Sequence, residues 1–204
     1  MERRASTAEC IERLSSSQAT EREEAARELF RQGCAAAEPA LRQWFANPEF
    51  RALIRAGRPL LAVGIAVTPA RFEQIRAGCG QPRLAEMPPG QDACEFEMEF
   101  SHGVRIDVLT TLNPGGGGAI ARFLARYGEG IQQVECNVAD VRLATQILRD
   151  HFGLEPVSPD SERPDDGRAG ADGTRVNFFL VPVAEGRKAL IELVENPSPK
   201  SRKR

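Results

Sequence analysis

The amino-acid sequence predicts an α+β fold in which a small all-α segment precedes two βαβββ units. Helical periodicity of the apolar residues marks the segment before residue 58. Alternating apolar residues, which are typical of strands, begin at about residue 60 in LLAVGIAV. The order of one strand, one helix and three strands then occurs twice. A chain of 204 residues can hold one domain with a sizeable core and a small appendage.

The N-terminal segment, residues 1–57, is predicted to contain two helices that stack as a hairpin. The first helix runs over residues 20–33, opens with capping-box spacing and stops at Gly33. The second carries an apolar face that includes Trp44. Residues 15–48 resemble a single HEAT-like helical repeat. Because one such repeat cannot bury its apolar face alone, we expect it to dock on the following domain or on a second subunit.

The following domain is predicted over residues 58–196. Its first unit, residues 60–112, opens with a strand and a helix that starts at Pro69. Three strands are then expected, near residues 82–87, 92–100 and 104–112. A linker helix over residues 119–127 leads to the second unit, residues 131–196. In that unit the helix ADVRLATQILRDHFG follows the strand GEGIQQVECNV, and three strands are expected near residues 154–158, 174–183 and 188–195.

The two units match each other position by position. Gly64 corresponds to Glu135, an offset of 71 (135 minus 64), and Asp107 corresponds to Glu192, an offset of 85 (192 minus 107). The larger second offset fits an insertion in the second unit, SPDSERPDDGRAGADG, which we expect to form a mobile flap. Residues 197–204 are predicted to be a disordered basic tail.

Composition limits the classes of function. Apolar residues make up 41% of the chain and charged residues 27%, the balance of a soluble globular protein. A net charge of -2 argues against nucleic acid and acidic membranes as partners. No apolar stretch approaches the length of a membrane span, so a cytoplasmic protein is expected. The five cysteines include no Cys-x-x-Cys pair and are predicted to be reduced, mostly structural thiols.

The strands LLAVGIAV and GEGIQQVECNV, the helix that follows the second of them, and the closing strands VRIDVLTTL and KALIELVEN resemble the vicinal-oxygen-chelate (glyoxalase/bleomycin resistance/dioxygenase) superfamily. Within it, they look most like the methylmalonyl-CoA epimerases. The resemblance implies that each unit forms half of an open barrel, around a cavity that commonly holds one divalent metal ion. It also implies four metal-ligand positions, which correspond to Ala62, Asp107, Gln133 and Glu192.

Two of these four positions have lost the histidine that the resemblance leads one to expect. Ala62 has no donor atom, and Gln133 offers an amide oxygen. Together with Asp107 and Glu192, this oxygen set suits Mg²⁺, Mn²⁺ or Ca²⁺ better than Zn²⁺ or Co²⁺. The sequence therefore predicts a degenerate site that holds a weakly bound divalent cation or none.

Strand alternation extends the predicted cavity wall. If Gln133 faces the cavity, so do Glu135 and Asn137, while Cys136 faces the helices. The alternative is that these polar residues form only the solvent-facing side of a strand. Cys136 in the core, together with the lack of a Ser-His-Asp or Cys-His arrangement, makes nucleophilic catalysis unexpected.

A glycine-rich run and two histidines are further candidates for a functional role. The run Asn113–Gly118 before the linker helix is either a flexible linker, which we favour, or a phosphate cradle at a helix N-terminus. His102 and His151 are expected to be structural or solvated.

Two functions remain open. One is a protein that binds a small molecule in a metal-free cavity, and we favour it because two expected ligands are lost. The other is a metal-dependent epimerase or lyase that acts on an acyl thioester or an α-keto compound, with Glu192 or Glu135 moving a proton. A homodimer is expected in either case.

Overall fold

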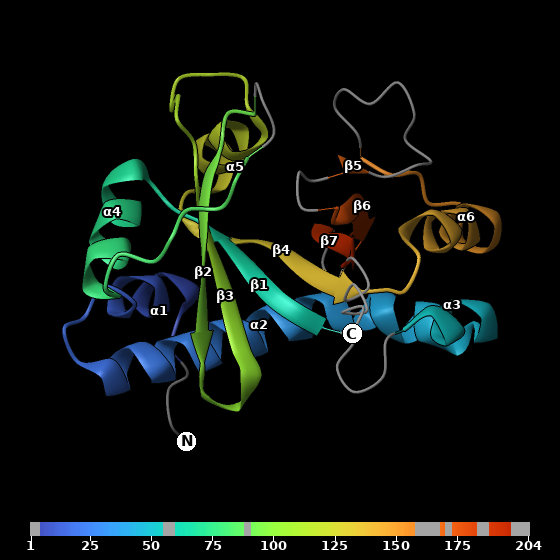
Figure 1. Ribbon diagram of the computed structural model, residues 1–204, viewed down its shortest axis with the longest axis horizontal. Coiled ribbons are helices and arrows are strands. Elements are labelled where there is room, and N and C mark those ends of the chain that lie inside the picture. The colour runs from blue at the N-terminus through green and yellow to red at the C-terminus, as the bar shows by residue number, and fades with distance from the viewer. Residues whose placement is uncertain are drawn as a thin grey trace, which may run out of the picture. The chain divides into compact units, whose positions relative to one another are not determined.

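A computed structural model describes residues 5–54, 60–87, 91–157, 168–169, 173–182 and 188–196 (Figure 1). The chain divides into two compact units. Unit 1 consists of Met1–Ala36 and Ala62–Val134, and unit 2 consists of Ala37–Leu61 and Glu135–Arg204. Each unit thus combines part of the N-terminal segment with one of the two repeated halves. None of the described helices is long and apolar enough to cross a membrane.

The sheet of unit 1 has the strand order β2-β3-β1-β4. Strands β2 and β3 form an antiparallel hairpin through the short turn η1, and β1 lies parallel to β3. The elements are α1 (Thr7–Arg13), α2 (Ala19–Ala46), β1 (Leu60–Ala66), α4 (Pro69–Gly78), β2 (Cys94–Phe100), η1 (Ser101–Gly103), β3 (Val104–Thr110), α5 (Ala119–Tyr127) and β4 (Gly130–Asn137). The predicted linker helix is therefore present as α5, whereas α2 and β4 each begin in unit 1 and end in unit 2.

The sheet of unit 2 has the strand order β4-β7-β6-β5, and its hairpin β6–β7 is antiparallel. Helix α6 begins after the N-cap Asp140, whose carboxylate accepts from the backbone N–H of Leu143, and ends at Gly153 in the left-handed conformation. The elements of this unit are α3 (Pro48–Leu53), α6 (Val141–Phe152), β5 (Arg168–Ala169), β6 (Arg175–Pro182) and β7 (Lys188–Glu195).

The predicted helical hairpin in the N-terminal segment is wrong. Helix α2 is continuous over 28 residues and contains both Gly33 and Pro39. Gly33 lies inside the helix and does not end it. Its lack of a side chain matters for packing, since a Cβ atom at this position would lie 2.6 Å from Cγ2 of Val63 in β1. The glycine thus lets the helix backbone approach the strand closely. A single continuous helix does not confirm the HEAT-like resemblance, but α2 does dock on the sheet of unit 1.

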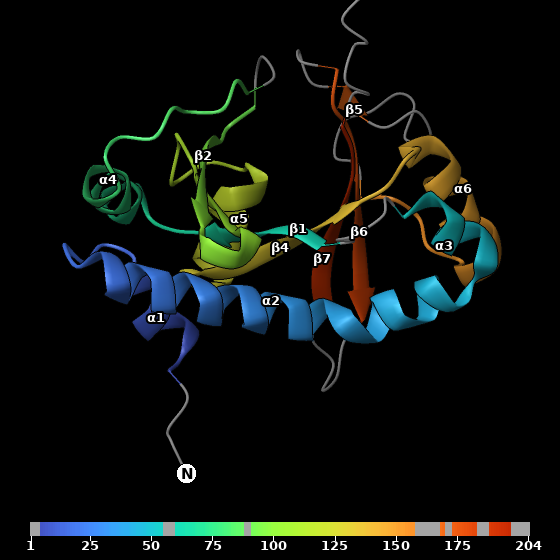
Figure 2. The ribbon, with the colours of Figure 1, turned by 60° about the horizontal axis from the view of Figure 1, so that its bottom comes forward.

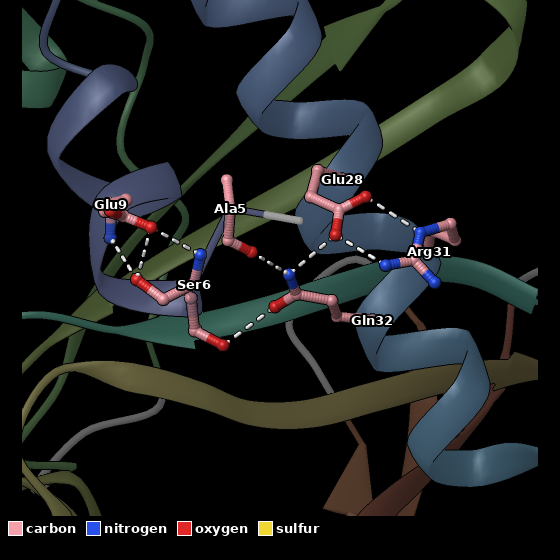
Figure 3. A network of polar contacts seen from close by, with 7 residues as sticks. Ala5, Ser6, Glu9, Glu28, Arg31 and Gln32 are labelled. Carbon is pink, nitrogen blue, oxygen red and sulfur yellow. Dashed lines mark hydrogen bonds and ion pairs between the residues drawn. The ribbon is translucent and has the colours of Figure 1, made fainter. Parts of the chain in front are cut away.

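Helix α1 is held against α2 by a polar network (Figure 3). Its N-cap Ser6 and Glu9 form a reciprocal capping box. The Thr7 hydroxyl donates to Oε1 of Gln32 over 2.7 Å, and Nε2 of Gln32 donates to the Ala5 carbonyl over 3.0 Å. Because Cys10, Ile11 and Leu14 are buried as well, α1 belongs to the core of unit 1.

The prediction of a strand is wrong at two places, one in each unit. Residues 82–87 and 154–157 have no regular structure. Each segment keeps a backbone hydrogen bond to a strand further along the chain, from the Ala85 N–H to the Glu95 carbonyl of β2 (2.8 Å) and from the Val157 N–H to the Phe178 carbonyl of β6 (2.7 Å). The expected flap lies almost wholly outside the described residues, and the C-terminal tail lies outside them entirely.

The predicted internal repeat is visible in the hydrogen bonding. In unit 1 the Val67 N–H donates to the Leu109 carbonyl, and in unit 2 the Val138 N–H donates to the Val194 carbonyl, both over 2.9 Å. The offsets are 71 (138 minus 67) and 85 (194 minus 109), which are the offsets that the sequence match of the two units predicts. Each unit therefore joins its opening and closing strands in the same register.

Candidate functional site

The two faces of β1 differ in their surroundings. Val63 points toward Gly33 of α2, so its neighbour Gly64 must face the opposite side of the sheet. On that opposite side, Ala66 packs with Ile120 of α5. Figure 2 shows α1 and α2 on one side of β1 and α5 on the other. The face of the sheet that lacks α2 is the one that holds the predicted site residues of unit 1.

Asp107 and Gln133 both lie on this face. Asp107 is the register partner of Gly64 on the adjacent strand β3 and is only 2% exposed. Gln133 on β4 is 6% exposed, and its Cγ lies 2.6 Å from the place where a Cβ of Gly64 would be. Register partners point to the same side of a sheet, so the carboxylate and the amide share one face. Ala62 shares it too, because it lies two residues before Gly64.

Two further charged residues, which the sequence reasoning missed, flank Asp107. Glu97 of β2 is its register partner on the other side, and Arg105 lies two residues before it on β3. Nη2 of Arg105 forms an ion pair with Oε2 of Glu97, and both side chains remain partly exposed. The sequence carried a signal, since acidic residues occupy every second position of CEFEMEF. Only the register of the hairpin shows that one of them lies beside Asp107.

Unit 2 holds the remaining predicted residues. Glu192 lies on β7, in register with Phe178 of β6, and is 7% exposed. The repeated register places Glu135 beside Glu192, as Gly64 lies beside Asp107. Asn137 follows two residues later on the same face of β4, and its Oδ1 is buried without a hydrogen-bond partner. Unit 2 therefore brings two carboxylates and one amide to one strand pair.

The chemistry of these donors decides which metal ions they could hold. Ala62 is fully buried and contributes no donor, and Asp107 and Gln133 contribute oxygen only. Within the described part of the chain, no three His, Cys, Asp or Glu side chains are grouped as a metal site. The residues present fit a hard, oxygen-loving cation and do not fit a site for Zn²⁺ or Co²⁺, which gain from imidazole.

The glycine-rich loop before α5 is held by a carboxylate from within the chain. Oδ2 of Asp92 accepts from the Thr111 hydroxyl over 2.9 Å, and Oδ1 accepts from the backbone N–H of Asn113 over 2.8 Å. A Cβ at Gly118, the N-cap of α5, would lie 2.5 Å from Oδ2 of Asp92. An anion of the protein therefore already lies at this helix N-terminus. The arrangement favours the connecting loop over the phosphate cradle.

Both histidines lie at exposed positions. His102 adopts a positive φ of 60° in the turn between β2 and β3. His151 lies in the last turn of α6, with Nε2 3.8 Å from a carboxylate oxygen of Glu49. Both imidazole rings are therefore exposed to solvent, as the sequence led us to expect.

Cys136 is buried in β4, and burial raises the pKa of its thiol to about 12 from the ordinary 9.0. Between these two values the unfolded chain loses the thiol proton and the folded chain keeps it. Stability is therefore fully present below pH 9 and falls as the pH rises toward 12, by up to about 1.4 kcal/mol per pH unit for this group. We expect Cys136→Ala to make the pH dependence shallower in urea unfolding at pH 8 to 10.5. Equal slopes for the two proteins would contradict this.

Comparison with known proteins identifies the class of protein to which this fold belongs. No family model and no curated protein matches the sequence. Among solved structures, methylmalonyl-CoA epimerase from Mycobacterium tuberculosis is 31% identical, with a TM-score of 0.52, and the alignment covers 70% of this chain and 89% of that one. A hypothetical protein from Bacillus halodurans is 25% identical, with a TM-score of 0.52 and coverage of 70% and 97%. A variant methylmalonyl-CoA epimerase from Streptomyces coelicolor, 24% identical, has a TM-score of 0.51 and coverage of 73% and 99%.

These matches confirm the vicinal-oxygen-chelate fold that the opening and closing strands predicted. At 31% identity over most of the Mycobacterium tuberculosis protein, the chain belongs to the family of the methylmalonyl-CoA epimerases.

Proposed function

We propose that this chain is a small-molecule-binding member of its family in which the metal site is degenerate. The observation that carries the proposal is Ala62, a buried residue without a donor atom at a position where the family resemblance leads one to expect histidine. Polar groups nevertheless remain buried on the strand faces, namely Asp107 and Gln133 in unit 1 and Glu192 in unit 2. Buried polar groups of this kind orient a ligand by hydrogen bonding, and they need no metal to do so.

An acyl thioester is the ligand class to test first. The Mycobacterium tuberculosis relative is a methylmalonyl-CoA epimerase, and the Streptomyces coelicolor structure holds 2-nitronate-propionyl-CoA. We expect propionyl-CoA to bind this chain in calorimetry with EDTA present, and Asp107→Asn to weaken that binding. Binding that needs an added divalent ion would reject the metal-free site. No binding under either condition would reject the proposal altogether.

A metal-dependent epimerase or lyase is the second candidate function. It is favoured by the two oxygen donors on one face of unit 1, which suit Mg²⁺, Mn²⁺ or Ca²⁺. Such an ion would polarise the carbonyl of a bound thioester. The candidates for a proton-transfer role are Glu135 and Glu192, which lie on neighbouring strands of unit 2. Exchange of the α-proton of an acyl thioester in D₂O, dependent on Mn²⁺ and lost in Glu192→Gln, would support this function over the first.

Self-association and location also remain proposals. We propose a homodimer, which light scattering on the purified chain would test, because a single species of monomer mass would exclude it. The cytoplasmic location stays a prediction from the sequence.

A further inference from the structure

Gly64 lies between the two oxygen donors of unit 1. Three neighbouring strands, β3, β1 and β4, carry Asp107, Gly64 and Gln133 in turn. The residue in the middle has no side chain, so the sheet face has a gap at this point. The corresponding position in unit 2 is occupied by Glu135, which has a long side chain. The gap is therefore a particular feature of unit 1.

The side chain of Gln133 fills most of this gap, and Leu109 of β3 borders it, with Cδ1 3.0 Å from the place of a Cβ at Gly64. A Cβ at Gly64 would lie 2.6 Å from Cγ of Gln133 and 3.3 Å from its amide carbon, Cδ. The Gln133 side chain thus leans from its own strand β4 toward β1. A contact of 2.6 Å is too short for two carbon atoms, so any side chain at position 64 would push Gln133 out of this place. On the far side of β1 lies β3, with Asp107 in register with Gly64.

We propose that Gly64 is a positioning residue that lets the Gln133 amide reach across β1 toward Asp107. The glycine thereby brings the Gln133 amide and the Asp107 carboxylate close together as a pair of polar groups. In the binding protein proposed above, this pair contacts the ligand, so the binding part of the inference rests on that proposed function. The placement of the Gln133 side chain itself does not rest on it.

The chain offers a matched control on the other face of the same strand. Gly33 of α2 also lacks room for a Cβ, which would lie 2.6 Å from Cγ2 of Val63. Gly33→Ala and Gly64→Ala therefore introduce similar clashes with β1 and its neighbours, on opposite sides of the sheet. Any effect that comes only from a strained sheet should appear in both variants. An effect through Gln133 should appear in Gly64→Ala alone.

The first experiment observes Gln133 directly. In ¹⁵N-labelled protein, the side-chain amide signals of Gln133 are assigned by their loss in Gln133→Ala. We expect a nuclear Overhauser contact between the Gln133 side chain and the Gly64 α-protons, and a shift of the amide signals in Gly64→Ala but not in Gly33→Ala. Absence of the contact, or equal shifts in both variants, would overturn the inference whether or not the protein binds propionyl-CoA.

The second experiment measures coupling through propionyl-CoA binding. Gly64→Ala should weaken binding at least about tenfold, and Gly33→Ala should leave it within about twofold of the parent. In a Gln133→Ala background, Gly64→Ala should have a much smaller further effect, because the side chain that it mainly displaces is absent and only the looser contact with Cδ1 of Leu109, at 3.0 Å, remains. An equal loss in both backgrounds would overturn the inference. If the parent protein binds no propionyl-CoA, the proposed function fails, and the amide signals alone decide the role of Gly64.

Discussion

Replacing Trp44 with alanine is expected to lower the free energy of unfolding by about 3–5 kcal/mol, the cost of removing a large buried aromatic side chain. Trp44 lies near the end of α2 and is 1% exposed. Its ring centroid lies 5.5 Å from that of Phe50 in α3 and 6.2 Å from that of Phe179 in β6. The C-terminal part of α2 thus supplies a central part of the core of unit 2. Urea unfolding of the two proteins measures the loss.

The next residue of the helix provides the control. Phe45 stacks on Phe50 at 6.2 Å but is only partly buried, so Phe45→Ala should cost clearly less than Trp44→Ala. If the two variants were destabilised equally, or if Trp44→Ala cost less than about 1 kcal/mol, the N-terminal segment would be an appendage rather than part of the core.

Restoring histidine at both altered positions is expected to create affinity for a transition metal. The double variant Ala62→His with Gln133→His adds two imidazoles to a face that already holds Asp107. Since Zn²⁺ and Co²⁺ gain from imidazole, we expect their affinity to rise by at least about tenfold, or about 1.4 kcal/mol. Competition with a chromogenic chelator measures Zn²⁺ affinity, and the visible spectrum of Co²⁺ reports its coordination.

The control for this variant removes a carboxylate. Adding Asp107→Asn to the two histidines should reverse much of the gain, because the metal then loses a charged ligand. Thermal unfolding must show that the double variant is folded, since Ala62 is fully buried and a larger side chain strains the packing there. A folded double variant with unchanged Zn²⁺ affinity would show that the two positions are not ligand positions.

The repeat and the fold could be predicted because they depend on local patterns. Strand alternation and the matched offsets placed Asp107 and Glu192 on equivalent strands, and the hydrogen bonds of Val67 and Val138 follow the same offsets. The helical hairpin was wrong because Gly33 is equally compatible with a helix end and with close packing. Only the contact with Val63, which lies in a different element far along the chain, distinguishes the two.

The neighbours of the site residues also could not be predicted from local patterns, because they are set by pairing between strands that lie far apart in the sequence. Alternation along β4 indicated that Gln133, Glu135 and Asn137 share a face, but it did not indicate which residues lie beside them. The place of Glu97 next to Asp107 follows from the register of the hairpin. The gap at Gly64 follows from the packing of Gln133 across a neighbouring strand. Neither can be read from a single strand.

The metal content of the protein, purified without chelator, tests the central claim most directly. With Ala62 and Gln133 in place of two imidazoles, we predict substoichiometric Zn, Co, Mn, Mg and Ca by mass spectrometry, together with propionyl-CoA binding that EDTA does not abolish. One equivalent of a tightly held transition metal, lost together with propionyl-CoA binding when Asp107 and Gln133 are replaced by alanine, would contradict the account.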